Sequence, residues 1–329
     1  MAWDSGLNVS RWAKQLAYEV GKEIYFSKFM GDTFGSMICS KTMPEGKGKD
    51  MTFGMVGLSG TAVTGDSTLE SNEDNLTSNE VTVTTAQRRF GVINAGKFDD
   101  SKVLYNFRKE ALAQLKRVFA EDHDAQLFSA LTKTSGAGAY LRADASASVY
   151  AATDPEADLV AADLATAADI SKLKKMAMLG TTKSYKMKPI RVNGKDHFIL
   201  ILHPEAAYDL ANDTQWLNAQ KYAQIRGEDN PIFSGALGIY DGVVVHEHEG
   251  ITTADDLGAG DAIPAARNLF LGAGAACYAK SDNMSWVEKT FDYGNKLGVA
   301  AGQIYGSAMS TFDSKDYAVI QYITARTNL

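Results

Sequence analysis

The longest regular pattern of apolar residues in this chain lies between Asp99 and Leu131. Apolar side chains recur there every three or four positions, the spacing of one face of a helix. The positions that define this face are Leu104, Phe107, Ala111, Leu115 and Val118. Asp99 to Ser101 supply N-cap residues and early carboxylates, and Lys133 with Ser135–Gly136 marks the end. We predict a helix of about 30 residues, 45 to 50 Å long, that supports the elements around it; an ordinary core helix is the alternative.

A second amphipathic helix is predicted between Asn8 and Lys28, with Asn8 or Ser10 as its N-cap. Its apolar positions also have helical spacing. They are Val9, Trp12, Ala13, Leu16, Val20 and Ile24. Two interpretations are open: the helix packs on its own domain, or it is an arm along a neighbouring subunit. In the second case Trp12 and Leu16 make the contact.

Between residues 41 and 94 the pattern changes to the alternation of strands. Residues 51–57 alternate large and small side chains, and residues 79–94 are rich in β-branched residues, so two strands are predicted. The loop between them contains no Lys or Arg, and carboxylates crowd it up to the second strand: Asp66, Glu70, Glu73, Asp74 and Glu80. Loops this long usually project or carry function, and an isolated hairpin is only marginally stable. We predict a projecting hairpin that contacts a neighbouring subunit through Met51, Phe53, Met55 and the carboxylates at positions 66, 70, 73 and 74.

The second half of the chain mixes helices and strands. A helix is predicted over residues 166–178, with Lys172, Lys174 and Lys175 on a solvated face. Residues 189–212 predict a strand, a tight turn at Asn193–Gly194, a strand, and a helix that begins after Pro204. Further strands are expected over residues 243–248, 289–302 and 316–327. The fold class is therefore α+β.

Composition narrows the function further. The chain has 329 residues, 45% of them hydrophobic, and a net charge of −7. It has no apolar run of membrane-spanning length and no signal peptide at its start, so we expect neither secretion nor a membrane contact. We see no Lys/Arg block that would grip phosphates, which argues against sequence-specific nucleic-acid binding. Cys39 and Cys277 stand far apart without a CxxC motif, which indicates a reducing compartment and no cysteine metal site.

Catalytic and metal-binding motifs are weak. His246 and His248, beside Glu247 and Glu249, would share one strand face and could bind zinc or nickel if a third ligand arrived from elsewhere. Their spacing of two in a strand does not fit the helical HExxH motif. No GxSxG is present, and LGAGAAC is not GxGxxG. We therefore assign no catalytic residue, metal or cofactor, and nothing in the chain demands an enzyme.

Several segments resemble the major capsid protein of tailed bacteriophages, and in particular the coat proteins of the N4 type. These segments are YFSKFMG at 25–31, GDSTLESNEDNL at 65–76, HPEAAYDLANDTQW at 203–216, NPIFSGALGIYDGVVV at 230–245 and FDYGNKLGVAAGQIYG at 291–306. The resemblance implies an HK97-like fold. It divides the chain into an N-terminal arm (1–44), an extended loop (45–95), a peripheral domain with a spine helix (96–165, completed by 287–329) and an axial domain (166–286).

The resemblance also implies the function. It predicts a homo-oligomer of pentamers and hexamers that forms an icosahedral head in the virion, assembled in the host cytoplasm around DNA contacted non-specifically. A portal and a separate scaffolding protein are expected partners, since no helical extension of the scaffolding type precedes Met1, and a decoration protein is left open. Two alternatives are an encapsulin-type shell with a cargo enzyme, and a metal-dependent hydrolase using His246 and His248.

Overall fold

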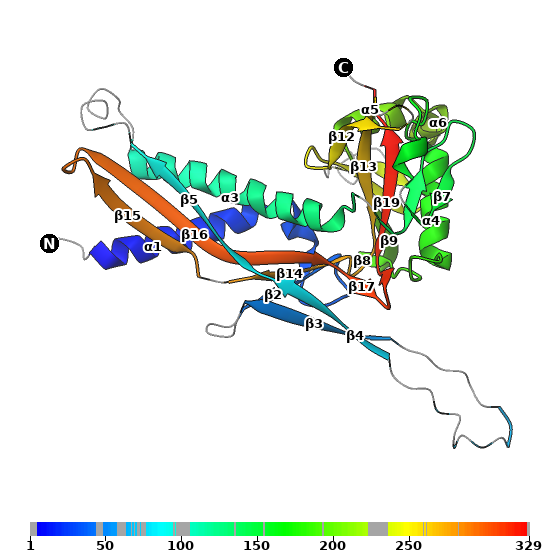
Figure 1. The fold of residues 1–329 in the computed structure, drawn as a ribbon, viewed down its shortest axis with the longest axis horizontal. Helices are drawn as coiled ribbons and strands as arrows, with labels where there is room; N and C mark the ends of the chain where they lie inside the picture. The colour runs from blue at the N-terminus through cyan, green and yellow to red at the C-terminus, as the bar shows by residue number, and fades with distance from the viewer. Residues whose placement is uncertain are drawn as a thin grey trace.

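The computed structural model describes most of the chain as placed helices, strands and loops (Figure 1). The residues that it describes are 5–43, 49–57, 64–66, 68, 70, 73, 77–94, 96, 106–134, 136–153, 155–192, 194–222, 236–258, 260, 262–281 and 283–327. Two large sheets divide them into a long body and a compact body. None of the described helices has the length and apolar character needed to cross a bilayer.

The long body consists of a six-stranded sheet with two helices and one 3₁₀ turn. Its helical elements are α1 (Ser5–Glu23), η1 (Tyr25–Phe29) and α3 (Phe107–Leu131). Its strands are β1 (Met30–Gly31), β2 (Ile38–Thr42), β5 (Ala86–Ile93), β14 (Ala276–Lys280), β15 (Ser285–Phe291) and β16 (Lys296–Met309). The strand order is β1-β2-β14-β16-β15, and β5 also pairs with β16. The hairpin of β3 (Asp50–Gly57) and β4 (Thr77–Thr84) leaves this body at its lower edge in Figure 1.

The compact body is built on a nine-stranded sheet. Its strands are β6 (Tyr140–Arg142), β7 (Val149–Ala151), β8 (Ile190–Val192), β9 (Lys195–Leu202), β10 (Ala236–Tyr240), β11 (Val243–Glu247), β12 (Thr253–Leu257), β13 (Ile263–Leu271) and β19 (Val319–Ala325). Its helical elements are η2 (Glu156–Asp158), α4 (Ala167–Leu179), α5 (Pro204–Asn212) and α6 (Thr214–Tyr222). The short pair β17 (Thr311–Phe312) and β18 (Lys315–Asp316) lies where the two bodies meet. The two strands and the helix predicted within residues 189–212 are confirmed as β8, β9 and α5, and Asn193 of the predicted turn lies outside the described residues.

The sheets do not follow the predicted domain boundaries. The segments 96–165 and 287–329 were expected in one domain, yet β6, β7 and β19 belong to the nine-stranded sheet. Conversely β14, inside the expected segment 166–286, belongs to the six-stranded sheet, as do β2 of the expected arm and β5 of the expected loop. The physical reason is that β19 is buried along its whole length, so it needs strands on both edges and inserts between β13 and β6.

Helix α3 begins later than the sequence predicts. Asn106 is its N-cap, with an extended backbone and a side-chain oxygen that accepts the N–H of Arg108 at 3.1 Å. Asp99 to Ser101 are therefore not its caps, and Lys133 lies beyond the C-cap Thr132. The helix runs along the sheet and packs on β5, β14 and β16.

Of the five residues predicted to face the core from α3, three do so and the last, Val118, does not. Ala111 and Leu115 are buried, and Phe107 is partly buried against the same core. Val118 is 38% exposed, so its core assignment is wrong. Its neighbour Phe119 takes the inward position and stacks edge-on against Phe90 of β5. Leu104 lies outside the described residues.

Helix α1 starts and ends before its predicted bounds. It already contains Asn8 and Ser10, so neither is the N-cap, and it ends at Glu23 instead of Lys28. The 3₁₀ turn η1 follows because the carboxylate of Asp124 on α3 accepts the backbone N–H groups of Tyr25 and Phe26, at 2.8 and 3.2 Å. A tertiary hydrogen bond thus sets where the helix stops.

A buried histidine joins α3 to the sheet below it. Gln303 of β16 donates from Nε2 to the carbonyl of Ser281, which turns its Oε1 toward His123 at 3.1 Å. Nε2 of His123 must then carry the proton, and Nδ1 accepts the hydroxyl of Tyr278 on β14. Burial is the main cause that lowers the pKa of His123 to about 4; the bond to Gln303 opposes this shift, and the charges of Lys280 and Arg88 add to it. The neutral ring is therefore the form that fits.

This arrangement predicts a loss of stability in acid. The folded-state pKa of His123 is about 4, below the ordinary value of 6.5, so the unfolded chain binds a proton first as the pH falls. Between pH 6.5 and 4 we expect His123 to cost the folded subunit about 3 kcal/mol. Urea unfolding of the wild type and of His123→Gln at pH 7 and pH 4.5 measures the difference. An equal pH dependence in the two proteins would contradict this account of the histidine.

Candidate assembly surfaces

The base of the β3–β4 hairpin packs on its own subunit. One side of the hairpin presents Phe53, Met55, Val81 and Val83, all buried. They form one cluster with Cys39 and Cys277, which oppose each other on the paired strands β2 and β14. Both cysteines are free and buried, and burial raises the pKa of the Cys277 thiol to about 11.

This packing corrects the prediction for the first strand of the hairpin. Phe53 is 0% exposed and Met55 is nearly so, while Met51 is partly buried against the same cluster. Their apolar side therefore does not face water in a single subunit, and no neighbour is needed to cover it. Only exposed side chains of the hairpin are free to meet another copy.

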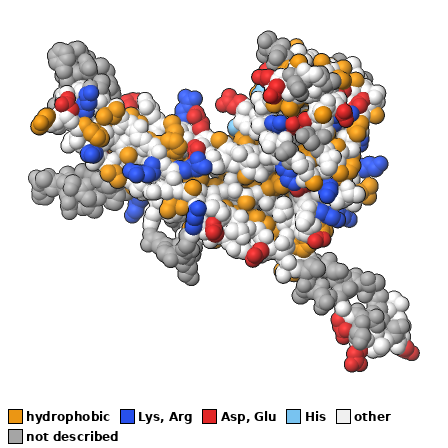
Figure 2. All heavy atoms as spheres, in the orientation of Figure 1, with side chains coloured by type: hydrophobic (Ala, Val, Ile, Leu, Met, Phe, Trp, Pro, Cys, Tyr) orange, Lys and Arg blue, Asp and Glu red, His pale blue; other side chains and the backbone are white. Residues whose placement is uncertain are grey.

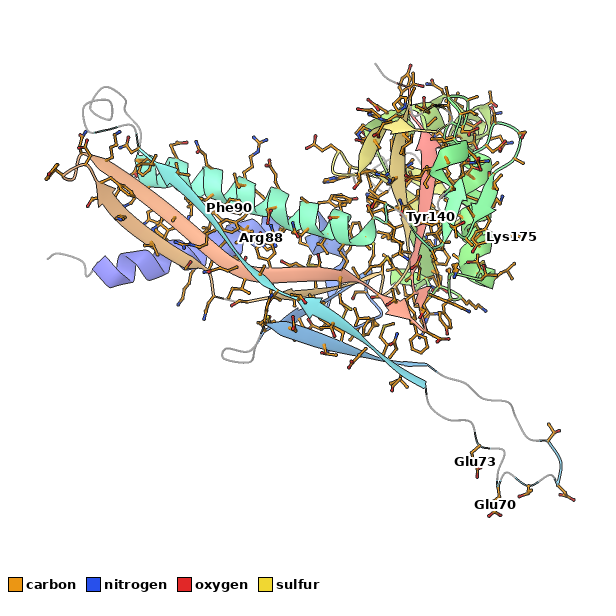
Figure 3. All side chains as sticks on the ribbon, in the orientation of Figure 1. Glu70, Glu73, Arg88, Phe90, Tyr140 and Lys175 are labelled. Carbon is orange, nitrogen blue, oxygen red and sulfur yellow. The ribbon has the colours of Figure 1, made fainter. Side chains whose placement is uncertain are left out.

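The far end of the hairpin carries exposed carboxylates. Asp66, Glu70 and Glu73 are all exposed, and Figure 3 shows Glu70 and Glu73 well away from both bodies. Glu80, on β4, is exposed too. Asp74 lies outside the described residues. We call Asp66, Glu70 and Glu73 the acidic tip.

The N-terminal helix also packs on its own subunit. Leu16 is 0% exposed, and Trp12 stacks on Trp286 of β15 with ring centroids 6.0 Å apart. Lys116 of α3 joins Glu23 of α1 in an ion pair of 2.5 Å. Of the two interpretations of this helix, the structure supports the first, and Leu16 is wrong as an inter-subunit contact.

His246 and His248 do not form a metal site with their neighbours. The ring of His248 lies 4.2 Å from that of Tyr25 and 4.8 Å from that of Phe128, and His246 packs edge-on against Phe29. Nδ1 of His248 accepts the N–H of Gly250, and burial lowers the pKa of the ring. Among the residues with described placement, no three His, Cys, Asp or Glu side chains gather in a way that could hold a metal ion.

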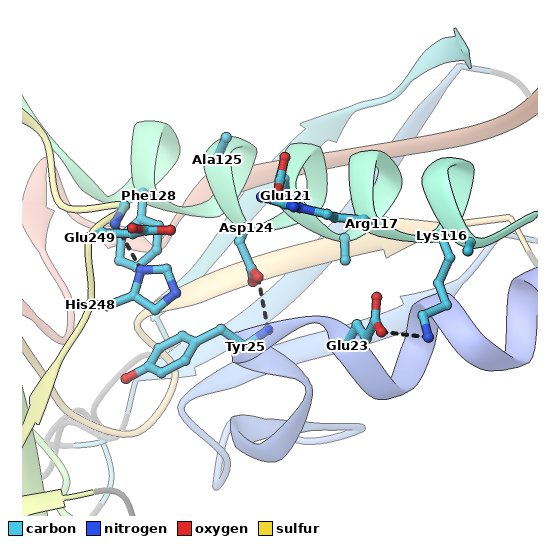
Figure 4. A pocket seen from close by; sticks show the side chains of 13 residues that line it. Glu23, Tyr25, Lys116, Arg117, Glu121, Asp124, Ala125, Phe128, His248 and Glu249 are labelled. Atoms are coloured by element: carbon cyan, nitrogen blue, oxygen red, sulfur yellow. Dashed lines mark hydrogen bonds and ion pairs between the residues drawn. The ribbon is translucent and has the colours of Figure 1, made fainter. Parts of the chain in front are cut away.

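A groove of about 830 Å³ lies between the end of α1, η1, α3 and the turn after β11 (Figure 4). Its charged walls are bonded within the chain: Lys116 to Glu23, Arg117 to Glu121 at 2.6 Å, and Asp124 to the backbone of η1. Burial raises the pKa of Asp124, against the opposing effect of these N–H donors. The groove is therefore lined by charged groups that connect α1, η1 and α3 to one another.

Comparison with known proteins decides the family. The sequence profile of the family described as "Phage capsid protein" matches residues 1–325. The chain belongs to the phage capsid protein family. It is a structural subunit of a virion shell, as the resemblance of its segments predicted. The α+β class and the HK97-like fold are likewise confirmed.

Individual relatives agree with this family over almost the whole chain. The major capsid protein of Pseudomonas phage KPP25 is 26% identical, over 95% of this chain and 94% of that protein. The capsid of Ralstonia phage GP4 superposes with a TM-score of 0.78 and 28% identity, covering 93% of this chain and 92% of that one. The capsid of cyanophage Pam1 shares the fold, with a TM-score of 0.74, 21% identity and 92% coverage of both chains.

The capsid subunit also has a basic segment that the sequence analysis missed. Between Ile170 and Lys195 no Asp or Glu occurs. Eight basic residues do: Lys172, Lys174, Lys175, Lys183, Lys186, Lys188, Arg191 and Lys195. The expectation that no Lys/Arg block grips phosphates stays a prediction, but it overlooked this local excess of positive charge. Helical spacing drew attention to three lysines of α4 alone, whereas counting charges across α4, the following loop and β8 would have revealed the whole segment.

The burial of Phe53 makes a testable difference within one strand. Phe53→Ala should lower the free energy of unfolding of the isolated subunit by about 3 to 5 kcal/mol, since it empties a closed core site. Val56→Ala, at a β3 position that is 67% exposed, should change it by less than about 0.5 kcal/mol. Urea titration of unassembled subunits tests both. If Phe53→Ala left the subunit intact and blocked assembly alone, Phe53 would face a neighbour after all.

Proposed function

We propose that this capsid subunit assembles into pentamers and hexamers of an icosahedral phage head that encloses double-stranded DNA. The observation that carries the proposal is the family match over residues 1–325, together with an acidic tip that projects from the body. Head-to-tail contacts of identical subunits close into rings, provided that each copy presents two different, complementary surfaces. A projecting hairpin gives each subunit one such surface.

Further expectations rest on the same family resemblance. We infer that the long body, with α3 as its spine helix, is the peripheral domain, and that the compact body is the axial domain. A separate scaffolding protein and a portal act in assembly, which takes place in the host cytoplasm. The packaged DNA is contacted non-specifically. Membership of the N4-type branch stays a prediction.

The matched relatives favour a head over the alternatives. The proteins named above are capsids of phages, which supports DNA as the content in place of a cargo enzyme. The hydrolase alternative would need a third ligand for His246 and His248, and the described part of the chain supplies none near them.

Electron microscopy of the expressed protein tests the proposal directly. Expressed with the other head proteins of its phage, the wild type should form closed shells of uniform size with icosahedral symmetry. The DNA content of particles from infected cells separates a phage head from a cargo compartment. A compact monomer that binds a stoichiometric metal ion under the same conditions would make the capsid proposal wrong.

The acidic tip should act in assembly and not in folding. Glu70→Lys combined with Glu73→Lys changes two exposed side chains, so the melting temperature of the subunit should stay within about 2 °C of the wild type. Rim ion pairs contribute only about 0 to 1 kcal/mol each, but every contact in the shell would be altered, so the yield of correctly sized particles should fall.

A matched control reverses two exposed carboxylates elsewhere, Glu247→Lys with Asp256→Lys on the compact body. Particle counts by electron microscopy and sedimentation compare the two double variants. Normal size, number and salt tolerance of the Glu70/Glu73 particles would show that the tip serves solubility alone.

A further inference from the structure

A hollow of about 570 Å³ lies on the basic segment, at the C-terminal end of α4. Lys172 and Lys175 line it together with Met176 and Leu179. Leu179 is 73% exposed, and Met178 beside it in the sequence is 51% exposed. The site therefore combines two ammonium groups with an apolar patch.

The end of α4 holds this hollow in shape. Gly180 is the C-cap with φ of 77°, a backbone conformation that favours glycine, and its N–H donates to the carbonyl of Met176. A Cβ on Gly180 would lie 3.1 Å from the backbone nitrogen of Lys186. The tight turn folds the loop after α4 back against the helix end. On the other side, the Tyr150 and Thr182 hydroxyls bond at 3.0 Å.

The two lysines of the hollow differ from their basic neighbours, since neither forms a close ion pair within the described part of the subunit. On the same helix, Lys174 pairs with Asp241 at 2.6 Å. On β8, Arg191 pairs with Asp196. Lys172 and Lys175 make no ion pair within 4.0 Å in the described part of the chain. Figure 3 shows Lys175 on the outer side of α4. Their charge is available to a partner.

We propose that this hollow receives the acidic tip of a second copy of the same chain. The tip segment, residues 66–73, contains three carboxylates and one leucine, Leu69, next to Glu70. This composition matches a site of two lysines around an apolar patch. The inference rests on the proposed function, and it specifies which surface the hairpin contacts.

Geometry and charge both point to a second copy as the partner. Glu70 and Lys175 lie far apart in the view of Figure 3, so the tip does not reach the hollow of its own subunit. Each subunit carries one acidic and one basic surface, the requirement for a repeated head-to-tail contact. DNA would also attract lysines, but it would not use the exposed Leu179 and Met178 beside them.

A charge exchange between the two surfaces tests the contact. Lys172→Glu with Lys175→Glu reverses the hollow, and Glu70→Lys with Glu73→Lys reverses the tip. Each double variant should lower the yield of closed particles about tenfold, because every contact then places like charges together. The variant with all four changes restores opposite charges, and its yield should return to within about threefold of the wild type.

Controls separate this contact from general effects of charge. Lys109→Glu with Lys289→Glu reverses two exposed lysines of the long body. This pair should assemble normally and should not rescue the reversed tip. Circular dichroism and melting of each subunit check folding. If the reversed hollow does not fold, Lys172→Gln with Lys175→Gln is used, and reversing the tip should then lower the yield no further.

Three results would overturn the inference. One is a fourfold variant that assembles no better than either double variant. Another is a reversed hollow that assembles as well as the wild type. The third is a reversed hollow that forms normal shells with less DNA, which would assign these lysines to DNA. Wild-type protein that forms no shell under the same conditions would instead contradict the proposed function itself.

Discussion

The packing of α3 on the six-stranded sheet is the interaction on which the other elements depend. One continuous core runs from α1 through α3 and the sheet, and reaches the compact body at Ile199, Ile201 and Leu269. Close packing of this kind transmits a shift at one element to its neighbours. Hydrogen bonds from α3 fix the orientation of the packed elements. His123 bonds to β14 and β16, and the carboxylate of Asp124 accepts backbone N–H groups at the point where α1 ends and η1 begins. A single helix thus fixes the position of the N-terminal segment and the sheet.

The second constraint is the pairing of buried polar groups, both inside the compact body and where the chain passes into it from the long body. Arg267 of β13 makes two bonds to the carboxylate of Glu156, at 2.5 and 2.8 Å, and both residues are buried. Lys133, just after α3, bonds Asp316 at 2.5 Å, and the same carboxylate accepts the N–H of Ala139. Buried charges are tolerated only when paired and hydrogen-bonded, so these bonds define where the crossing segments lie.

Two charged surfaces of the subunit are separated along the sequence, whereas acidic and basic side chains are interspersed over the rest of the face shown in Figure 2. The acidic tip lies at the end of a hairpin whose base is closed by apolar packing, and the basic segment lies on α4 and the loop after it. A subunit that keeps opposite charges apart gains little electrostatic stability alone. Identical copies can satisfy these charges together, and contacts of this type favour correct orientation more than raw affinity.

The sequence by itself determined the elements with strong periodicity. The helical spacing between Asp99 and Leu131 and the alternation in the hairpin each depend on neighbours within a few positions, and the structure confirms a helix over residues 107–131 and both hairpin strands. The predicted turn includes Asn193, which lies outside the described residues, and the strands that flank it pair as predicted. The exposure of the acidic tip could also be predicted from the sequence, since a loop with several carboxylates and no basic residue stays in water without any tertiary contact. The family resemblance came from the number and order of whole segments, which a local error does not erase.

Only the tertiary structure decided which surfaces the chain covers for itself. Val118 and Phe119 are adjacent and both apolar, and only the position of Phe90 shows which of them faces inward. Trp12, Leu16 and Phe53 look like contacts for a neighbour until β15, α3 and β14 are placed against them. The sheets cross the predicted domain boundaries for the same reason, because β19 pairs with strands far away in the chain. Burial depends on residues that are distant in the sequence. The periodicity of an apolar face shows that something covers it, but not whether the same chain or a neighbouring subunit does so.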